Sequence, residues 1–205
     1  MPMDQNRWVW IGLDLGQRRD HSAIAVVERV WEQAKPDEFL RSGLDGLWSF
    51  RVRMLERLRL DTPYPDVVKR VDQISMMPLI AMGRTVVVDG TGVGPPVVDM
   101  LRRTLDCRVH PVLITGGSRP STHLHGGYES VPRSVLLTAL QVLVQHGRLT
   151  VSSRCRHAET LRRELLGLKL NGPGSEEHDD LAIAVALAVW KARVGATVEV
   201  VQRRR

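Results

Sequence analysis

The chain has 205 residues, a formal net charge of +6 and a pI of about 10.0. This length fits one domain, and an apolar share of 43% is enough for a sizeable core. Aromatic residues make up only 4% of the chain, so that core must be mainly aliphatic. No apolar run reaches the roughly 18 residues of a membrane-spanning helix, and no secretory signal follows the N-terminus. We therefore expect a cytoplasmic protein with no membrane partner.

The positive charge is unevenly distributed. Arginines are concentrated in two clusters, one at Arg51, Arg53, Arg57 and Arg59 and the other at Arg154, Arg156, Arg162 and Arg163. A basic surface attracts polyanions, nucleic acid above all, because it neutralises phosphates and releases their counterions. Positive charge also keeps proteins soluble, so charge alone leaves the two interpretations open.

The first part of the chain has the pattern of three strands. Trp8–Leu15 is a short apolar run that predicts a buried strand ending in an acid, and Ser22–Val30 predicts a second strand after a turn. Leu47–Met54 predicts a third strand, and Ala34–Gly46 is expected to be a loop. These three strands are expected to be antiparallel.

Helices and strands alternate in the next part. Apolar residues spaced three and four apart predict helices at Pro65–Ala81 and Val97–Leu105. Apolar runs predict buried strands at Arg84–Asp89 and Arg108–Ile114. Alternation of this kind indicates that these strands join the sheet in parallel.

The remainder is mostly helical. Three helices are predicted, at Val131–His146, Arg156–Leu166 and Asp179–Val194, and Leu149–Ser152 is expected to be a short edge segment. Two stretches without periodicity are expected to be loops, the glycine-rich Thr115–Glu129 and the polar Asn171–Glu177. We expect one domain over residues 1–205, with flexible ends at 1–7 and 195–205.

Acidic residues stand where two strands end and where one helix begins. Asp14 in GLDLG and Asp89 in VVDGTGVG each end a strand, and Asp179 and Asp180 open the last helix. Functional groups of open α/β sheets gather beyond the carboxyl ends of the strands, so these acids are expected to converge. Crowded carboxylates repel one another unless a cation neutralises them. Mg²⁺ and Mn²⁺ prefer oxygen ligands, and two such ions can support phosphodiester hydrolysis.

Each acid also has an ordinary explanation. Asp14 can hydrogen-bond a turn, and Asp179 or Asp180 can cap a helix. His178 is a possible ligand or proton relay. The interpretation that it merely precedes the helix is slightly favoured. Glycines beside the strand-end acids would let a substrate backbone approach closely. Chance placement of all three acidic sites at one end of the sheet is the less attractive explanation.

Four motifs, in this order, resemble the nuclease domain of phage terminase large subunits. They are GLDLGQRRDHSAIAVVE, VVVDGTGVGPPVVDML, TGG followed by VPRSVLLTALQVLVQHGRL, and EEHDDLAIAVALAVW, and the match spans Trp8–Arg193. The resemblance implies a ribonuclease-H-like α/β fold. Its mixed sheet would have three antiparallel strands followed by parallel strands, flanked by helices. It also implies a metal-dependent endonuclease that cuts double-stranded DNA during viral genome packaging.

The resemblance implies roles for individual residues. Asp14, Asp89 and Asp180, with Asp179 as second choice for the last position, would be the catalytic ligands of two divalent cations, Mg²⁺ or Mn²⁺. Arg133 matches a basic position of the family and is an expected DNA contact. Arg18, Arg19 and Arg119 are further expected DNA contacts.

One departure separates the chain from complete terminases, which carry a packaging ATPase with a P-loop. No GxxxxGK[ST] motif occurs in these 205 residues. The expected partners are double-stranded DNA and, in the cytoplasm of a host cell, a separate packaging ATPase, a small terminase subunit or a portal.

Three other functions stay open from the sequence. DLG and DGTG also resemble the phosphate loops of actin-like ATPases and sugar kinases, although 205 residues are short for the two domains of that class. A non-catalytic DNA-binding protein would keep the basic clusters and use the acids structurally. A junction resolvase would share the fold and the acids and differ in substrate shape.

Overall fold

The first three strands form an antiparallel meander. The computed structural model describes residues 8–16, 20–33, 46–78, 80, 83–92, 95–117, 121–125, 127–168 and 179–202. β1 (Val9–Asp14) pairs with β2 (Ala23–Gln33), which pairs with β3 (Gly46–Arg57). β2 and β3 extend beyond the predicted ranges because they pair along their whole length. Apart from Gly46, the predicted loop between them lies outside the described residues.

Two further strands join the sheet in parallel, as the alternating pattern predicted. β4 (Arg84–Asp89) pairs with β1, and β5 (Arg108–Thr115) pairs with β4. α3 (Pro95–Thr104) connects these two strands.

α2 (Tyr64–Ser75) connects β3 to β4 and is shorter than the sequence pattern suggested. The prediction extended it to Ala81. The helix ends earlier because Ser75 Oγ donates a hydrogen bond to Asp72 O at 2.9 Å, in competition with the next backbone turn. Pro78 follows closely and has no backbone N–H to continue a helix.

The glycine-rich stretch predicted as a loop contains a β-hairpin instead. β6 (Ser121–His125) pairs antiparallel with β7 (Tyr128–Pro132). β7 also adds in parallel to β5, with Val112 opposite Glu129. Gly127 supplies the positive φ of 84° that the tight turn requires. The prediction failed here because the strand signal of β7 is short and only its last two residues are buried.

The final part of the chain supplies a short strand and three helices. They are α4 (Arg133–Gln145), β8 (Leu149–Val151), α5 (Ala158–Gly167) and α6 (Asp180–Gln202). β8 adds in parallel to the outer side of β3 and confirms the expected edge segment. The helix expected to end at Val194 continues to Gln202, since no proline interrupts it and Gly195 alone does not end it. No helix among the described residues has the length and apolar character needed to span a membrane.

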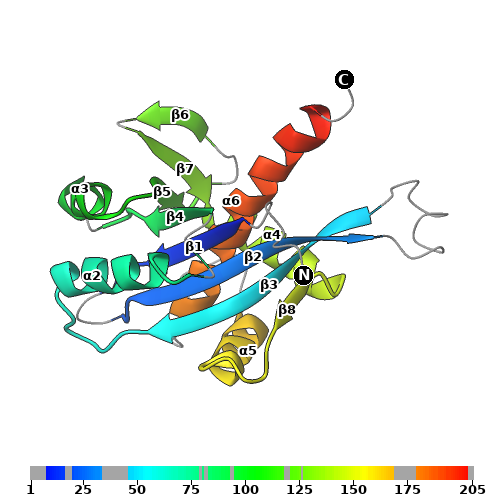
Figure 1. The fold of residues 1–205 in the computed structure, drawn as a ribbon, viewed down its shortest axis with the longest axis horizontal. Coiled ribbons are helices and arrows are strands. Elements are labelled where there is room, and N and C mark those ends of the chain that lie inside the picture. Colours follow the sequence, from blue (N-terminus) through cyan, green and yellow to red (C-terminus); the bar gives the residue numbers. More distant parts are fainter. Residues whose placement is uncertain are drawn as a thin grey trace.

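The eight strands make one mixed sheet in the order β6-β7-β5-β4-β1-β2-β3-β8. This confirms the predicted mixed α/β sheet with an antiparallel part and a parallel part. α2 and α3 pack with the sheet in one apolar cluster, and α4, α5 and α6 in the other, so helices cover both faces (Figure 1). β1 and β4 lie in the middle and are buried on both faces, which explains their uninterrupted apolar sequences.

α6 lies directly against β1, and Gly12 makes this possible. A Cβ atom at Gly12 would lie only 1.8 Å from Ala184 O. The residues of α6 that face the sheet include the small Ala184 and Ala188, which are fully buried. The pairing of a glycine with alanines therefore sets the distance between the central strand and the helix.

Gly12→Ala should destabilise the protein by about 3 kcal/mol or more, because β1 and α6 would have to separate. Chemical denaturation of the purified variant measures this loss. Gly116→Ala is the matched control, since a Cβ there would meet no atom within 4 Å. Equal stabilities of the two variants would show that the contact between β1 and α6 tolerates displacement.

Candidate active site

Two of the predicted acids stand side by side at the carboxyl ends of the central strands. Leu13 of β1 is in register with Val88 of β4, so Asp14 and Asp89 follow on neighbouring strands. Side chains alternate between the two faces of a strand. Asp14 is therefore on the same face as Gly12, and Asp89 on the same face as Val87, and this is the face covered by α6.

The N-terminus of α6 brings the other two predicted acids to this face. Asp180 begins the helix and is only 4% exposed, and Asp179 precedes it and accepts the Ile183 N–H at 2.9 Å through its backbone oxygen. Each carboxylate has an arginine partner. Asp179 pairs with Arg133 at the start of α4, and Asp180 Oδ2 lies 3.3 Å from Arg57 Nη2 at the end of β3.

Electrostatics shows that the four acids share one region. Burial, followed by the carboxylates of Asp89, Asp180, Asp179 and Asp20, raises the pKa of Asp14 well above its usual range. Burial also raises the pKa of Asp89, although its Oδ1 accepts the Thr91 N–H at 2.8 Å. Asp14 thus interacts with the other predicted acids, and their role as a shared ligand set stays a prediction. Acids separated by more than 160 residues interact across the end of one sheet.

Glu164 of α5 is a fifth carboxylate in this region and is buried like Asp180, and sequence analysis missed it. It is 7% exposed, and burial raises its pKa to about 7. Glu164 Oε2 accepts the Ala182 N–H of α6 at 2.8 Å, and Oε1 pairs with Arg57. Arg57 thus contacts both Glu164 and Asp180. The signal that could have found Glu164 is its spacing of three from Leu161, on the buried side of the helix.

The chemistry of this donor set suits a hard divalent cation. All the candidate ligands are carboxylate oxygens. The pKa of Asp14 is raised by burial and then by the charges of its acidic neighbours, and a cation would relieve that repulsion. Within the described part of the chain, no three acidic, histidine or cysteine side chains are already grouped closely enough to hold one ion. The ion pairs explain this, because Arg133 and Arg57 draw Asp179 and Asp180 toward themselves.

The glycines beside the acids have a different role from the one expected. A Cβ at Gly16 would lie 2.2 Å from Asp20 O, and one at Gly90 would lie 2.6 Å from the ring of Tyr128. The protein's own turn and its own ring fill these spaces, so neither glycine leaves room for a substrate backbone. Gly92 differs, because nothing lies within 4 Å of its missing Cβ.

The predicted DNA contacts are only partly described. Arg133 is half-buried and pairs with Asp179, so it stands inside the acidic region and not on an outlying surface. Arg18, Arg19, Arg119 and His178 lie outside the described residues. Their predicted roles stay predictions.

Comparison with solved structures identifies the architecture. The nuclease of the large terminase from the thermophilic phage G20c superposes with a TM-score of 0.58 at 20% identity, over 89% of this chain and 81% of that one. Its form with bound magnesium gives 0.55 at 20% identity, over 90% and 82%. The manganese-soaked terminase nuclease domain of human cytomegalovirus gives 0.54 at 14% identity, over 88% and 81%. The chain has the fold of terminase nuclease domains.

This result confirms the resemblance found in the sequence at the level of the fold. No protein-family model matches the chain, and no curated protein is significantly similar to it in sequence. The terminase nuclease fold accounts for nearly all of the chain that the structure describes, from β1 to α6.

Asp14→Asn should stabilise the metal-free protein at pH 8 by about 0.5–2 kcal/mol, because it removes a buried charge from among other carboxylates. Thermal denaturation in EDTA measures the difference. Asp99→Asn, the same change on the exposed surface of α3, should leave the melting temperature nearly unchanged. A destabilised Asp14→Asn protein would contradict the proposed repulsion.

The same experiment has a pH dependence of defined sign. A carboxyl group whose pKa is raised on folding contributes stability below its unfolded pKa, and this stability is lost as pH rises through the folded pKa. For Glu164 the window runs from about 4.5 to about 7. Wild-type stability in EDTA should therefore fall across this window, and Asp14→Asn should fall less steeply because Asp14 contributes in the same direction.

Glu164→Ala should cost about 1–3 kcal/mol, because it leaves the Ala182 N–H without its acceptor and removes one of the two carboxylate partners of Arg57. Urea denaturation at pH 8 gives the value. Glu159→Ala on the exposed side of the same helix is the matched control and should change stability little. If the two variants unfold at the same urea concentration, Glu164 does not hold α5, α6 and β3 together.

Proposed function

We propose that the protein is a metal-dependent DNA endonuclease of the terminase large-subunit type. The observation that supports this most directly is the half-buried acid Asp14, whose pKa is raised by burial and then by Asp89, Asp180 and Asp179 at one end of the sheet. A carboxylate cluster of this kind is costly in a protein that binds no cation. The terminase nuclease fold gives the cluster a chemical purpose, since solved structures with this fold contain magnesium or were soaked in manganese.

Under this proposal Asp14, Asp89 and Asp180 hold two divalent cations, Mg²⁺ or Mn²⁺, and Asp179 assists. The bound ions supply a water of lowered pKa and charge neutralisation at the leaving 3′-oxygen of the scissile phosphodiester. The raised pKa of Asp14 means that cation binding competes with protonation at this residue. We expect activity to rise with pH until Asp14 is ionised.

The chain's own cations would position the reactants. Arg57 and Glu164 fix the first turn of α6, and with it the carboxylate of Asp180. Arg133 pairs with Asp179 and places its guanidinium among the acids. There it can release this carboxylate and bind a substrate phosphate instead. Thr91 joins the ends of two strands, since its Oγ1 accepts the Ile114 N–H at 2.8 Å while its N–H binds Asp89.

The wider role proposed is cleavage of double-stranded viral DNA during packaging in the host cytoplasm. A separate packaging ATPase, a small terminase subunit and a portal are the proposed partners. An ATPase of the actin or sugar-kinase type is less well supported, because that chemistry gives no role to the acids at the start of α6.

Purified protein with Mn²⁺ should convert supercoiled plasmid to nicked and linear forms, and EDTA should stop the reaction. Asp14→Asn, Asp89→Asn and Asp180→Asn should each slow cleavage by at least about 100-fold, the upper range for losing even an outer partner of a metal ligand. Asp106→Asn at the opposite end of the sheet is the control and should cut at the wild-type rate. Gel quantification of the three plasmid forms gives the rates.

Two outcomes would contradict the proposal. One is an absence of Mn²⁺-dependent cutting by protein that is folded by circular dichroism. The other is cutting that survives Asp14→Asn, which would indicate a contaminating nuclease. Tight ATP binding, measured by calorimetry, would instead revive the ATPase interpretation.

A further inference from the structure

The two arginine clusters of the sequence meet in a surface pocket away from the acids. The pocket has a volume of about 340 Å³ and lies where β3 continues past the end of β8. Its polar lining consists of Arg53, Glu56, Arg70, Arg154, Cys155 and Arg156. Arg53 and Glu56 come from β3 and Arg70 from α2, while Arg154, Cys155 and Arg156 come from the turn between β8 and α5.

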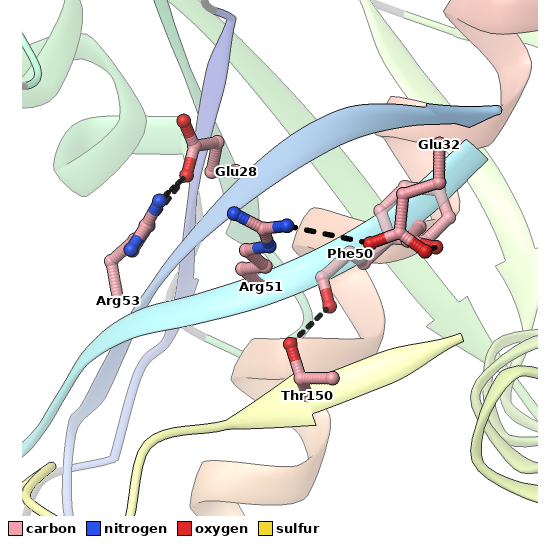
Figure 2. A network of polar contacts seen from close by, with 7 residues as sticks. Glu28, Glu32, Phe50, Arg51, Arg53 and Thr150 are labelled. Atoms are coloured by element: carbon pink, nitrogen blue, oxygen red, sulfur yellow. Dashed lines mark hydrogen bonds and ion pairs between the residues drawn. The ribbon is translucent and has the colours of Figure 1, made fainter. Parts of the chain in front are cut away.

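The positive charge of this pocket is only half neutralised. Arg70 forms a bidentate pair with Glu56, with Nε–Oε1 and Nη2–Oε2 distances of 2.9 and 2.8 Å. Arg53 turns toward Glu28 of β2 and pairs with it (Figure 2). Arg154 and Arg156 are exposed, and no carboxylate of the described residues forms an ion pair with either. The guanidinium groups of Arg154 and Arg156 are thus exposed to solvent. They lie beside those of Arg53 and Arg70, which are held in ion pairs.

The pocket lies at the edge of the sheet, where β3 continues past β8, and the acids lie at the middle strands on the face that α6 covers. The strand register places Asp14 opposite Ala23, and Ala23 opposite Arg57. Arg57 of β3 is therefore level with Asp14 of β1 along the strand direction. Arg53 lies four residues earlier on β3, which at about 3.3 Å per residue is roughly 13 Å along the strand. The pocket is thus displaced from the acids along β3 as well as across the sheet.

We propose that this arginine pocket is a second phosphate-binding site, which holds the backbone of duplex DNA away from the point of cleavage. The inference rests on the proposed function for its choice of DNA as the polyanion. Arg154 and Arg156 contact the phosphates, and the ion pairs of Arg53 and Arg70 keep the pocket open. Contacts of this kind carry no base information, so they set the register of the duplex without sequence preference.

The test measures binding without cleavage, by fluorescence anisotropy of a labelled 30-base-pair duplex in EDTA over a series of KCl concentrations. Each phosphate contact contributes about −0.9 to the slope of log K against log [salt]. The Arg154→Gln, Arg156→Gln double variant should therefore have a slope shallower by about 1.8. At 0.1 M salt its affinity should fall by at least about tenfold.

A matched variant controls for net charge. Arg103→Gln with Arg108→Gln removes the same two charges at the opposite end of the sheet, where α3 ends and β5 begins, and both residues are exposed. Its slope should equal that of the wild type. Equal losses in the two double variants, a wild-type slope in the pocket variant, or no binding of duplex by the wild type would each overturn the proposal.

Cysteine footprinting tests the site without changing it. Cys155 lines the pocket and Cys107 lies at the start of β5, and both are free thiols. Saturating duplex should slow iodoacetamide labelling of Cys155 and leave that of Cys107 unchanged, as measured by peptide mass spectrometry. Equal labelling of Cys155 with and without duplex would refute the site. A wild type that binds duplex here and cuts nothing with Mn²⁺ would refute the nuclease proposal alone.

Discussion

The close packing of α6 on β1 is the constraint on which the rest of the structure depends. Gly12 and the alanines of the helix let two backbones approach within van der Waals distance. This contact determines how far the N-terminus of α6 stands from the carboxyl end of β1, and so how near Asp180 comes to Asp14. A larger side chain at this point would separate the acids while leaving each element intact. The packing of the core and the positions of the acids therefore depend on the same distance, that between β1 and α6.

Repulsion between the acids destabilises this arrangement, and a small number of arginines offset the repulsion. Burial raises the pKa values of Asp14 and Asp89, and repulsion by the neighbouring acids raises that of Asp14 further, which marks the cluster as a local loss of stability. Arg57 and Arg133 limit that loss by pairing with the acids at the start of α6. Proteins commonly accept such costs where function requires a strained or repulsive site, and a packed core elsewhere offsets them.

The sequence was sufficient for the parts of the fold that have strong local signals. The buried strands β1 and β4 and the acids that end them follow from apolar runs closed by Asp14 and Asp89. The hairpin of β6 and β7 could not be predicted, because β7 is stabilised by pairing with β5, and β6 by pairing with β7, and not by their own pattern. Glu164 and Arg57 were missed for a related reason. Their importance arises from contacts between α5, β3 and α6, which no single segment encodes.

The separation of the acids along the chain has a consequence for the timing of folding. Asp14 and Asp89 leave the ribosome before Asp180 and the helix that covers their face. At about 5–20 residues per second, the early strands exist for on the order of ten seconds without their partner. During that time the carboxylates stand apart and the cluster is not yet assembled. The acids are therefore brought together only after α6 has been synthesised and has packed on β1.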